Sequence, residues 1–473
     1  MKMDNYKLFK DYAEDVAKKF IKIDKNMPLR IISHHDADGI SACAILLKLL
    51  NLDNRRYTLT VVQQLNKDLL YLLSKEDYKY YFFVDLGSGQ LKEITKFLKD
   101  KIVFILDHHI PAEVKIEENI IHLNPILFGI DGGLEISGAG VVYFFARAVN
   151  KEIENLAHIA IIGAIGDLQE KNGFLTLNQE ILDTAVQLNK MKVERGLRLF
   201  GAQTRPLHKV LEYSTDPYIP DVTGSESGAI QFLLQLGINP KRGNKWRKFI
   251  HLSEDEIKKL VAGIVMKRLN EDNPEDILGN VYILVEEKEE NPTRDAREFS
   301  TLLNACGRMG NASLGIGTCL GDEKIKKKAI ENMVRYKREI VSSLRWYEKN
   351  RNTEHVIKGK KFLIINAKNN IKSSLIGTIA SIISRSVEVE KGTYILTMAD
   401  VLDGTIKVSL RKAGKNNEDL RELIKIICEN IENAQFGGHK SASGAIIPLS
   451  KEQEFIKRAK LILSKKAIEE EVL

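Results

Sequence analysis

Short apolar runs alternate with segments of helical spacing along the first 185 residues. The runs predict buried strands at residues 29–35, 57–62, 80–87 and 101–109. Apolar residues at helical spacing predict helices at residues 40–50, 91–99, 137–149 and 154–167. Strands that are almost continuously apolar and alternate with helices are typical of a parallel sheet covered by helices on both faces. The pattern therefore predicts an α/β fold with a doubly wound N-terminal domain at residues 1–185.

A second, smaller α/β pattern begins after residue 357. Its predicted strands lie at residues 361–367, 393–399, 405–411 and 443–449, and its predicted helices lie at residues 373–386 and 418–431. We place this C-terminal domain at residues 358–473. Residues 323–350 have helical spacing without Gly or Pro, so the stretch 323–357 is expected to join the two domains through a helix.

The central residues, 186–322, are predicted to form an inserted or accessory region. Residues 201–228, with three of the ten prolines, are expected to be an ordered loop with short helices. Residues 295–317 are rich in small side chains and are expected to be irregular as well. A helix is predicted between these two segments, at 252–269.

Histidine and aspartate side chains follow three of the N-terminal strands. The sequence His34-His35-Asp36-Ala37-Asp38-Gly39 lies at the carboxyl end of the first strand, Asp85 at that of the third, and Asp107-His108-His109 at that of the fourth. Asp167 ends a predicted helix. Because ligands bind beyond the carboxyl ends of parallel strands, we expect these side chains to meet at one edge of the sheet.

Such a cluster predicts a metal site. Several carboxylates in one crevice repel one another unless cations neutralise them. Carboxylates mixed with imidazoles suit Mn²⁺, Fe²⁺, Co²⁺ or Zn²⁺ better than Ca²⁺. A single Asp after a strand is usually a cap or a turn residue, but four such motifs at strand and helix ends favour a site for two ions. Two ions that share a carboxylate are the arrangement that hydrolyses phosphate esters.

Composition and charge add little to the prediction of a metal site. The chain has 473 residues, 71 Lys and Arg against 64 Asp and Glu, a net charge of +7 and a pI near 8.9, which agrees weakly with a polyanionic partner. The basic segments 241–248 and 324–328 are more typical of solvated surfaces than of nucleic-acid contacts. The four cysteines are far apart, which argues against disulfides and cysteine-bound zinc. With no apolar run of membrane length, a cytoplasmic protein without membrane association is expected.

The motifs resemble those of the DHH phosphoesterase superfamily, in which HxDxDG, a strand-end Asp, DHH and GxxxD follow in this order. The segment Phe436–Gly444 (FGGHKSASG), preceded by VSLR at 408–411, resembles the DHHA1 substrate-binding domain that accompanies this core. The motifs together span residues 34–445. The length and the blocks at 204–220 and 302–310 are most similar to archaeal RecJ-like exonucleases, a group that includes the GINS-associated nuclease.

The resemblance implies two divalent ions, with Mn²⁺ expected and Mg²⁺ or Co²⁺ as alternatives. One ion would be held by His34, Asp36 and Asp85. The other would be held by Asp38, Asp85, His108 and Asp167. Asp107 would support the histidines, and His109 would face the scissile phosphate as a catalytic donor. Spacing by two from Asp36 favours His34 as the ligand of the first motif, with His35 as the alternative.

The C-terminal motif predicts phosphate binding. Gly437 and Gly438 would let backbone N–H groups approach a phosphate, and His439 and Ser443 would add donors from what we expect to be a loop. Arg411, at a predicted strand end, would grip a phosphate with two hydrogen bonds. These five residues are the predicted substrate contacts.

Together these features predict a two-metal exonuclease that is specific for single strands and releases 5′-mononucleotides in DNA replication or repair. Polarity 5′→3′ on DNA follows from the resemblance to RecJ; 3′→5′ polarity and an RNA substrate stay open. One alternative is a nano-RNase or pAp phosphatase of the same superfamily. Another is a replisome scaffold with little catalysis, as in the RecJ-related subunit of the eukaryotic replicative helicase. The expected partners are single-stranded nucleic acid and GINS or other replisome proteins.

Overall fold

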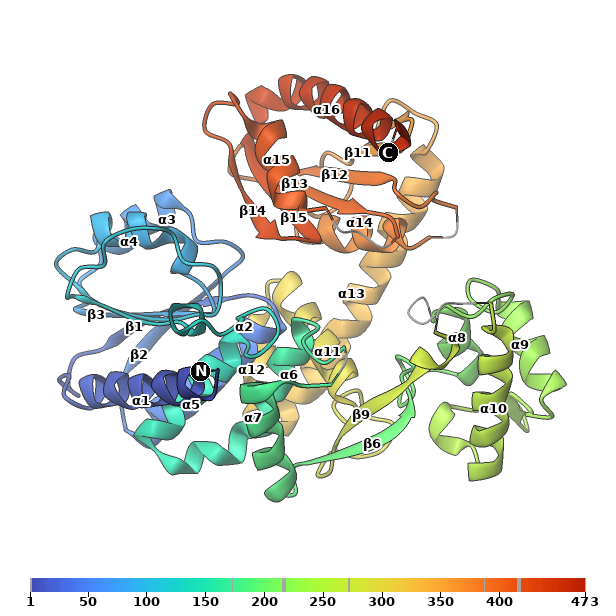
Figure 1. Cartoon of the computed structure of the whole chain (residues 1–473), viewed down its shortest axis with the longest axis horizontal. Coiled ribbons are helices and arrows are strands. Elements are labelled where there is room, and N and C mark those ends of the chain that lie inside the picture. The colour runs from blue at the N-terminus through green and yellow to red at the C-terminus, as the bar shows by residue number, and fades with distance from the viewer. Residues whose placement is uncertain are drawn as a thin grey trace. The chain divides into compact units, whose positions relative to one another are not determined.

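The computed structural model describes residues 2–171, 173–214, 218–270, 273–386, 388–414 and 418–472. The chain forms two compact units, residues 1–333 and residues 334–473, and each is described by itself (Figure 1). Among the helices of the described ranges, none combines the length and the apolar character needed to span a bilayer.

The first unit contains a five-stranded sheet in the order β2-β1-β3-β4-β5. All neighbouring strands are parallel. The strands are β1 (Leu29–His34), β2 (Tyr57–Val62), β3 (Tyr80–Val84), β4 (Ile102–Leu106) and β5 (Ile120–Leu123). The predicted parallel α/β sheet is confirmed, whereas β5 was not predicted.

Helices cover both faces of this sheet because successive strand residues point to opposite sides. Phe83 and Ile105 belong to the apolar cluster under α3 (Lys67–Ser74) and α4 (Leu91–Phe97). Their neighbours Phe82 and Phe104 stack on each other and meet Phe20 of α1 (Lys2–Ile21) on the other face. Figure 1 shows α3 and α4 on one side of the sheet and α1 on the other.

Four further helices complete the core of the first unit. They are α2 (Ala37–Leu52), α5 (Gly138–Val149), α6 (Ala157–Gly166) and α7 (Thr176–Gln187). The segment expected to be irregular at 295–317 is instead helical, with α11 (Ala296–Arg308) and α12 (Ala312–Cys319) packed on α2, and α11 also packed on α6. Its small residues, which suggested a loop, let these helices approach their neighbours closely.

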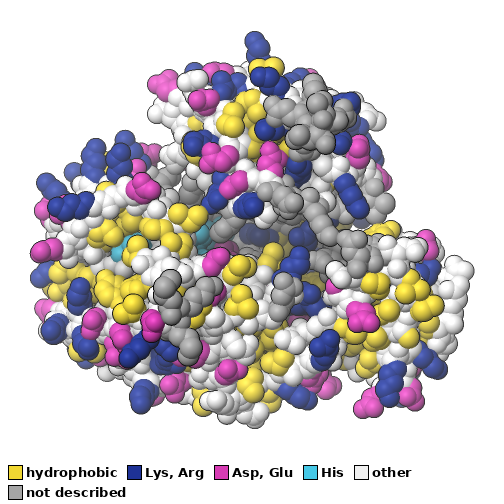
Figure 2. All heavy atoms as spheres, in the orientation of Figure 1, with side chains coloured by type: hydrophobic (Ala, Val, Ile, Leu, Met, Phe, Trp, Pro, Cys, Tyr) yellow, Lys and Arg dark blue, Asp and Glu magenta, His cyan; other side chains and the backbone are white. Residues whose placement is uncertain are grey.

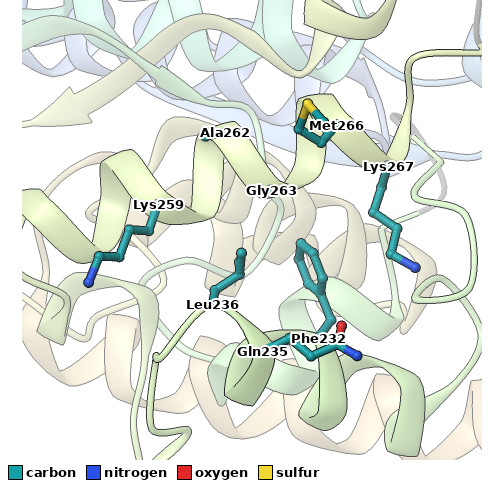
Figure 3. A pocket seen from close by; sticks show the side chains of 8 residues that line it. All are labelled: Phe232, Gln235, Leu236, Lys259, Ala262, Gly263, Met266 and Lys267. Atoms are coloured by element: carbon teal, nitrogen blue, oxygen red, sulfur yellow. The ribbon is translucent and has the colours of Figure 1, made fainter.

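The central residues carry their own apolar core. Strand β6 (Met191–Leu197) pairs antiparallel with β9 (Leu278–Leu284), and the short strands β7 (Lys241–Arg242) and β8 (Lys245–Trp246) form a second pair. Helices α8 (Leu207–Glu212), α9 (Glu226–Gln235) and α10 (Glu254–Lys267) lie between β6 and β9 in the sequence and pack around Leu211, Leu233 and Ile264. A surface hollow of about 670 Å³ lies between α9 and α10 (Figure 3).

The second unit contains a mixed six-stranded sheet in the order β10-β11-β12-β13-β15-β14. The strands are β10 (Val356–Gly359), β11 (Phe362–Asn366), β12 (Tyr394–Asp400), β13 (Thr405–Lys412), β14 (Gln435–His439) and β15 (Ala442–Pro448). Only β11 and β12 are parallel neighbours among these pairs. The helices are α14 (Ile376–Ser384), α15 (Leu420–Cys428) and α16 (Glu452–Val472), and α13 (Glu323–Asn350) precedes the sheet.

The glycine-rich segment of this unit differs from the prediction. It was expected to be a loop, but residues 435–439 form the edge strand β14, paired with β15 through Gly437 opposite Gly444 and His439 opposite Ala442. The segment has no strand-like alternation of apolar residues, so its own sequence gives little sign of the pairing. The partner strand β15, with a clear alternation of buried residues, supplies the register.

Candidate metal centre

The strand and helix ends of the first unit bring the predicted acidic and imidazole groups together. His34 ends β1, Asp85 directly follows β3, and His108 comes two residues after β4. Asp36 and Asp38 stand at the start of α2, and Asp167 is the cap at the end of α6. Atoms of these six residues form groups compact enough to hold metal ions.

The first group joins His34, Asp36 and Asp85. His34 Nδ1 lies 3.1 Å from Asp36 Oδ1 and 3.4 Å from Asp85 Oδ2. Asp36 caps α2, where its Oδ1 accepts a hydrogen bond of 3.0 Å from the N–H of Gly39. The imidazole beside these two carboxylates is that of His34, and His35 belongs to none of the ligand groups found among the described residues.

The second group is centred on His108. Its Nε2 lies 3.3 Å from Asp85 Oδ1, 3.3 Å from Asp167 Oδ2 and 3.7 Å from Asp38 Oδ2. Its Nδ1 lies 2.6 Å from the carbonyl oxygen of Gly132, which can only accept, so Nδ1 carries a hydrogen. In the neutral ring this leaves the lone pair of Nε2 directed at the carboxylates, the orientation of a metal-binding histidine.

Asp85 takes part in both groups. Its side chain is 1% exposed, and its backbone has φ of +57°, a left-handed conformation that is uncommon outside Gly, Asn and Asp. A Cβ at Gly138 would collide with Asp85 Oδ1, so α5 can begin beside this carboxylate only with glycine there. Among the described residues, both oxygens of Asp85 are buried without a hydrogen bond, as are His34 Nδ1 and His108 Nε2.

Buried polar atoms without partners are costly, so this set fits cations that the four atoms would coordinate.

The pKa shifts of the acids and histidines in these groups also agree with a cation site. Burial, with the neighbouring Asp85 and Asp167, raises the pKa of Asp38 well above its usual value. Burial chiefly, with Asp36 and Asp85, raises the pKa of Asp167 to about 7. Burial alone would lower the pKa of His108, but the surrounding carboxylates outweigh it and raise that pKa. Protons are thus favoured where divalent ions would otherwise neutralise the carboxylates.

Asp107 holds the DHH segment in place, and with Asp85, His108 and His109 it forms a third group of potential ligands. Its Oδ1 accepts hydrogen bonds from the backbone N–H of His108 at 2.8 Å and from Nδ1 of His109 at 2.7 Å. Its Oδ2 accepts the N–H of Ser88 at 2.9 Å. Asp107 is fully buried, whereas the ring of His109 is 34% exposed and is therefore accessible to a substrate.

A buried polar network behind Asp107 was missed by the sequence analysis. The side-chain amide of Asn124, directly after β5, donates to Ser88 Oγ at 2.9 Å and to the carbonyl oxygen of His109 at 2.8 Å. His122 Nε2 lies 2.9 Å from the same Ser88 hydroxyl. These residues brace the DHH segment from β5. Their only sequence signal was a polar pair at the end of a short apolar run.

Close backbone packing holds the first motif from two sides. On one side, Asp38 accepts the N–H groups of Gly138, at 2.6 Å, and of Ala139, at 3.0 Å, at the start of α5. On the other, Asn304 of α11 accepts the N–H of Ala37 at 3.2 Å. A Cβ at Gly307 would collide with the carbonyl oxygen of His35. The segment that was predicted to be irregular therefore supports the candidate site directly.

The predicted substrate contacts lie in the second unit. The guanidinium of Arg411 is braced by Ser381 Oγ at 3.0 Å and Ser409 Oγ at 3.1 Å. Gly437 and Gly438 are exposed on β14, and nothing lies within 4 Å of where a Cβ would stand at Gly437. Ser443 is buried, and its hydroxyl donates to the carbonyl oxygen of Leu420 at 2.8 Å. The side chain of His439 lies outside the described residues.

Other surface features do not share this chemistry. The hollow between α9 and α10 in Figure 3 is lined by apolar residues such as Phe232 and Met266 and by two lysines, with no acidic or imidazole side chain among its described lining. In the basic segment at 241–248, Arg247 pairs with Glu256. By contrast, Figure 2 shows histidine side chains that reach the surface beside hydrophobic ones.

Three domain models match the chain. The DHH family N-terminal domain matches residues 28–165, the DHH-CID domain matches residues 199–281, and the DHHA1 domain matches residues 359–465. An uncharacterised protein of Methanocaldococcus jannaschii is 34% identical over 443 residues, which cover 92% of this chain and 93% of that protein. The cell division control protein 45 homolog of Mus musculus is 30% identical over 105 residues, 22% of this chain and 19% of that protein.

Solved structures share the fold at low sequence identity. CDC45 from Entamoeba histolytica superposes with a TM-score of 0.63 at 13% identity, over 98% of both chains. RecJ from Thermus thermophilus in complex with Mn²⁺ gives a TM-score of 0.58 at 14% identity and covers 97% of this chain. The chain spans about half of that RecJ, 55% of its length. An exonuclease RecJ bound to manganese gives 0.55 at 14% identity, over 96% of this chain and 94% of that one.

Proposed function

The chain belongs to the DHH family, and from that premise we propose that it is a metal-dependent, RecJ-like exonuclease that releases 5′-mononucleotides from single-stranded DNA in the 5′→3′ direction. The observation that carries this proposal is the convergence of buried, unpartnered atoms of His34, His108 and Asp85. A scaffold would have no use for such a costly arrangement.

Two divalent ions, Mn²⁺ in our proposal, fit the donor set. One would be held by His34, Asp36 and Asp85. The other would be held by Asp38, Asp85, His108 and Asp167. Divalent ions in such a site lower the pKa of water and neutralise charge on a phosphate.

The residues around the ions have separate tasks. Asp107 fixes the ring of His109 through Nδ1, which leaves the exposed part of that ring to donate to a phosphate oxygen as charge develops. Gly138 leaves the room that Asp85 needs to lie between both groups. Asn124 holds the backbone of His109 from behind, so the donor is oriented before substrate arrives.

Phosphate binding in the second unit completes the proposal. Arg411, already oriented by two serines, and the exposed backbone of Gly437 and Gly438 would contact the phosphates of the strand, with His439 as a further donor. The hydroxyl of Ser443 already donates to the carbonyl oxygen of Leu420 inside the domain. Ser443 is therefore proposed to stabilise β14 and β15 rather than to contact the substrate.

Exposed apolar side chains favour a nucleoside-containing substrate over an inorganic one. Ile110, next to His109, is 62% exposed, and Leu168, next to Asp167, is 69% exposed. Leu168 also has φ of +60°, a strained conformation for a leucine, of the kind that concentrates at functional sites. A base or sugar adjoining the scissile phosphate would cover this apolar surface.

The test is digestion of single-stranded DNA and RNA labelled at the 5′ or the 3′ end, with Mn²⁺ or Mg²⁺ and with chelator. We expect 5′-mononucleotides from the 5′ end of DNA, no reaction in chelator, and loss of activity in Asp85→Asn. Asp100→Ala, which removes an exposed acid of the same unit, is the matched control and should keep full activity. Release of nucleotides from the 3′ end would contradict the proposed polarity. Cleavage of di- to tetranucleotides alone would contradict the proposed substrate.

A second function, docking on a replisome complex such as GINS, is favoured by the full-length fold similarity to CDC45. It is compatible with catalysis in the same chain. Co-elution of the purified protein with purified GINS would support it, and separate elution at micromolar concentrations would contradict it. The four cysteines are buried and free of disulfides, which suits a reducing compartment such as the cytoplasm.

A further inference from the structure

One face of α13 carries an exposed stripe of basic and small apolar residues. From residue 334 onward this helix belongs to the second unit. The stripe consists of Val334, Lys337, Arg338, Val341, Ser342 and Arg345, and these residues line a shallow hollow of about 440 Å³. Helical spacing places all six on one side of the helix. The opposite side is buried, with Tyr336 only 4% and Tyr347 only 8% exposed.

The arginines of the stripe are not neutralised. Arg338 and Arg345 are exposed, and neither forms an ion pair or a hydrogen bond with any other described residue. Two acids of the same helix are paired with other cations instead: Glu339 with Lys372, and Glu348 with Arg351. None of the six residues of the stripe is acidic. Two guanidinium groups therefore face solvent with their full donor capacity.

The stripe has the extent and mixture of a site for a chain of phosphates. From Val334 to Arg345 there are eleven residue-to-residue steps, which correspond to about 16 Å along a helix. With phosphates spaced by about 3.4 Å or more along a strand, this length matches roughly three to five nucleotides. Val334 and Val341, 43% and 46% exposed, offer apolar contact to sugars and bases beside the cations. A single small anion would need only one end of the stripe.

We propose that this stripe binds the backbone of single-stranded nucleic acid, apart from the residues that would hold the scissile phosphate. The chemical class of the ligand rests on the proposed function. An acidic protein segment fits less well, because helical peptides dock through larger apolar anchors than two valines.

The test is fluorescence anisotropy with a labelled 15-nucleotide oligothymidylate in chelator, so that no cleavage occurs. Arg338→Ala/Arg345→Ala should weaken binding about tenfold or more. It should also reduce the slope of log affinity against log salt by about 1.4, since each phosphate contact on a single strand contributes about 0.7. Lys457→Ala/Lys460→Ala removes two exposed lysines of α16 in the same unit and should leave the slope unchanged. Arg338→Lys/Arg345→Lys should keep the slope.

Hydrolysis separates this surface from the function of the site. With metal, the double alanine variant should raise KM for the 15-mer and leave hydrolysis of a dinucleotide unchanged. One outcome is that the wild type cleaves no substrate while the double alanine variant still has a smaller slope of log affinity against log salt. That result would support the binding surface and contradict the proposed nuclease activity. If binding by the double variant equals that of the wild type, or if poly-glutamate displaces the oligonucleotide at equal charge concentration, the surface proposal is overturned.

Discussion

The acidic cluster of the first unit and the glycine-rich edge strand of the second both suit phosphate chemistry, but they are built in opposite ways. The cluster is buried, crowded and fixed by close contacts, such as that between Gly138 and Asp85. The strand β14 is exposed, and its Gly437 has open space around it. The proposed site of reaction is therefore rigidly preorganised, whereas the proposed substrate surface is open at Gly437.

The largest effect is expected for the carboxylate shared by both ligand groups. Asp85→Asn keeps the shape and tolerates the left-handed backbone, but it removes the charge. Turnover should fall about a thousandfold or more, since each tenfold loss corresponds to about 1.4 kcal/mol of transition-state stabilisation. Steady-state kinetics at saturating Mn²⁺ measure this. A variant that keeps more than about a tenth of the wild-type rate would remove Asp85 from its central position.

A pair of glycines tests the comparison directly. Gly138→Ala introduces a Cβ that collides with Asp85, so activity should be nearly lost and stability should fall by about 1–3 kcal/mol. Gly437→Ala meets no atom within 4 Å and should leave the free energy of unfolding unchanged, with at most a modest rise in KM. Urea unfolding and kinetics on both variants check this. Equal loss of stability in the two would show that the strand is as tightly fixed as the cluster.

Replacement of each of the two adjacent histidines of the first motif should change the metal requirement to a different extent. His34→Ala should raise the Mn²⁺ concentration needed for half-maximal activity by about 10–100-fold or more, because a ligand is lost. His35→Ala should change this concentration less. Metal titration of the activity ranks the two variants, and the reverse order would move the ligand to His35.

The network behind the DHH segment should act on turnover rather than on metal binding. Asn124→Ala removes the hydrogen bonds to Ser88 Oγ and to the carbonyl oxygen of His109. We expect kcat to fall about tenfold with an unchanged Mn²⁺ requirement. If metal affinity falls in parallel with kcat, Asn124 supports the ligands instead of His109.

The smallest effect is expected in the second unit. Arg411→Ala should raise KM about two- to fivefold, which is the loss of binding expected when a partly exposed ion pair is removed. The values of kcat and metal content should stay near normal. Kinetics and metal analysis of the purified variant decide this. Loss of metal from the Arg411 variant would contradict the division of tasks between the two regions.

The sequence predicted the parallel sheet and its acidic edge because each motif there directly follows a continuous apolar run. It missed β5, with Asn124, because that run is only four residues long and includes a histidine. It also missed Gly138 and Gly307, whose importance comes from contacts with residues far away in the chain. The glycines of β14 suggested a loop because strand pairing with β15, rather than local preference, makes that segment extended.

The central claim is that the buried, unpartnered atoms around Asp85 bind two divalent ions. Isothermal titration of the metal-free protein with Mn²⁺ tests it most directly. We predict two ions bound per chain in the wild type and fewer than two in Asp85→Asn. Absence of binding in the wild type, or an unchanged stoichiometry and affinity in Asp85→Asn, would contradict the account.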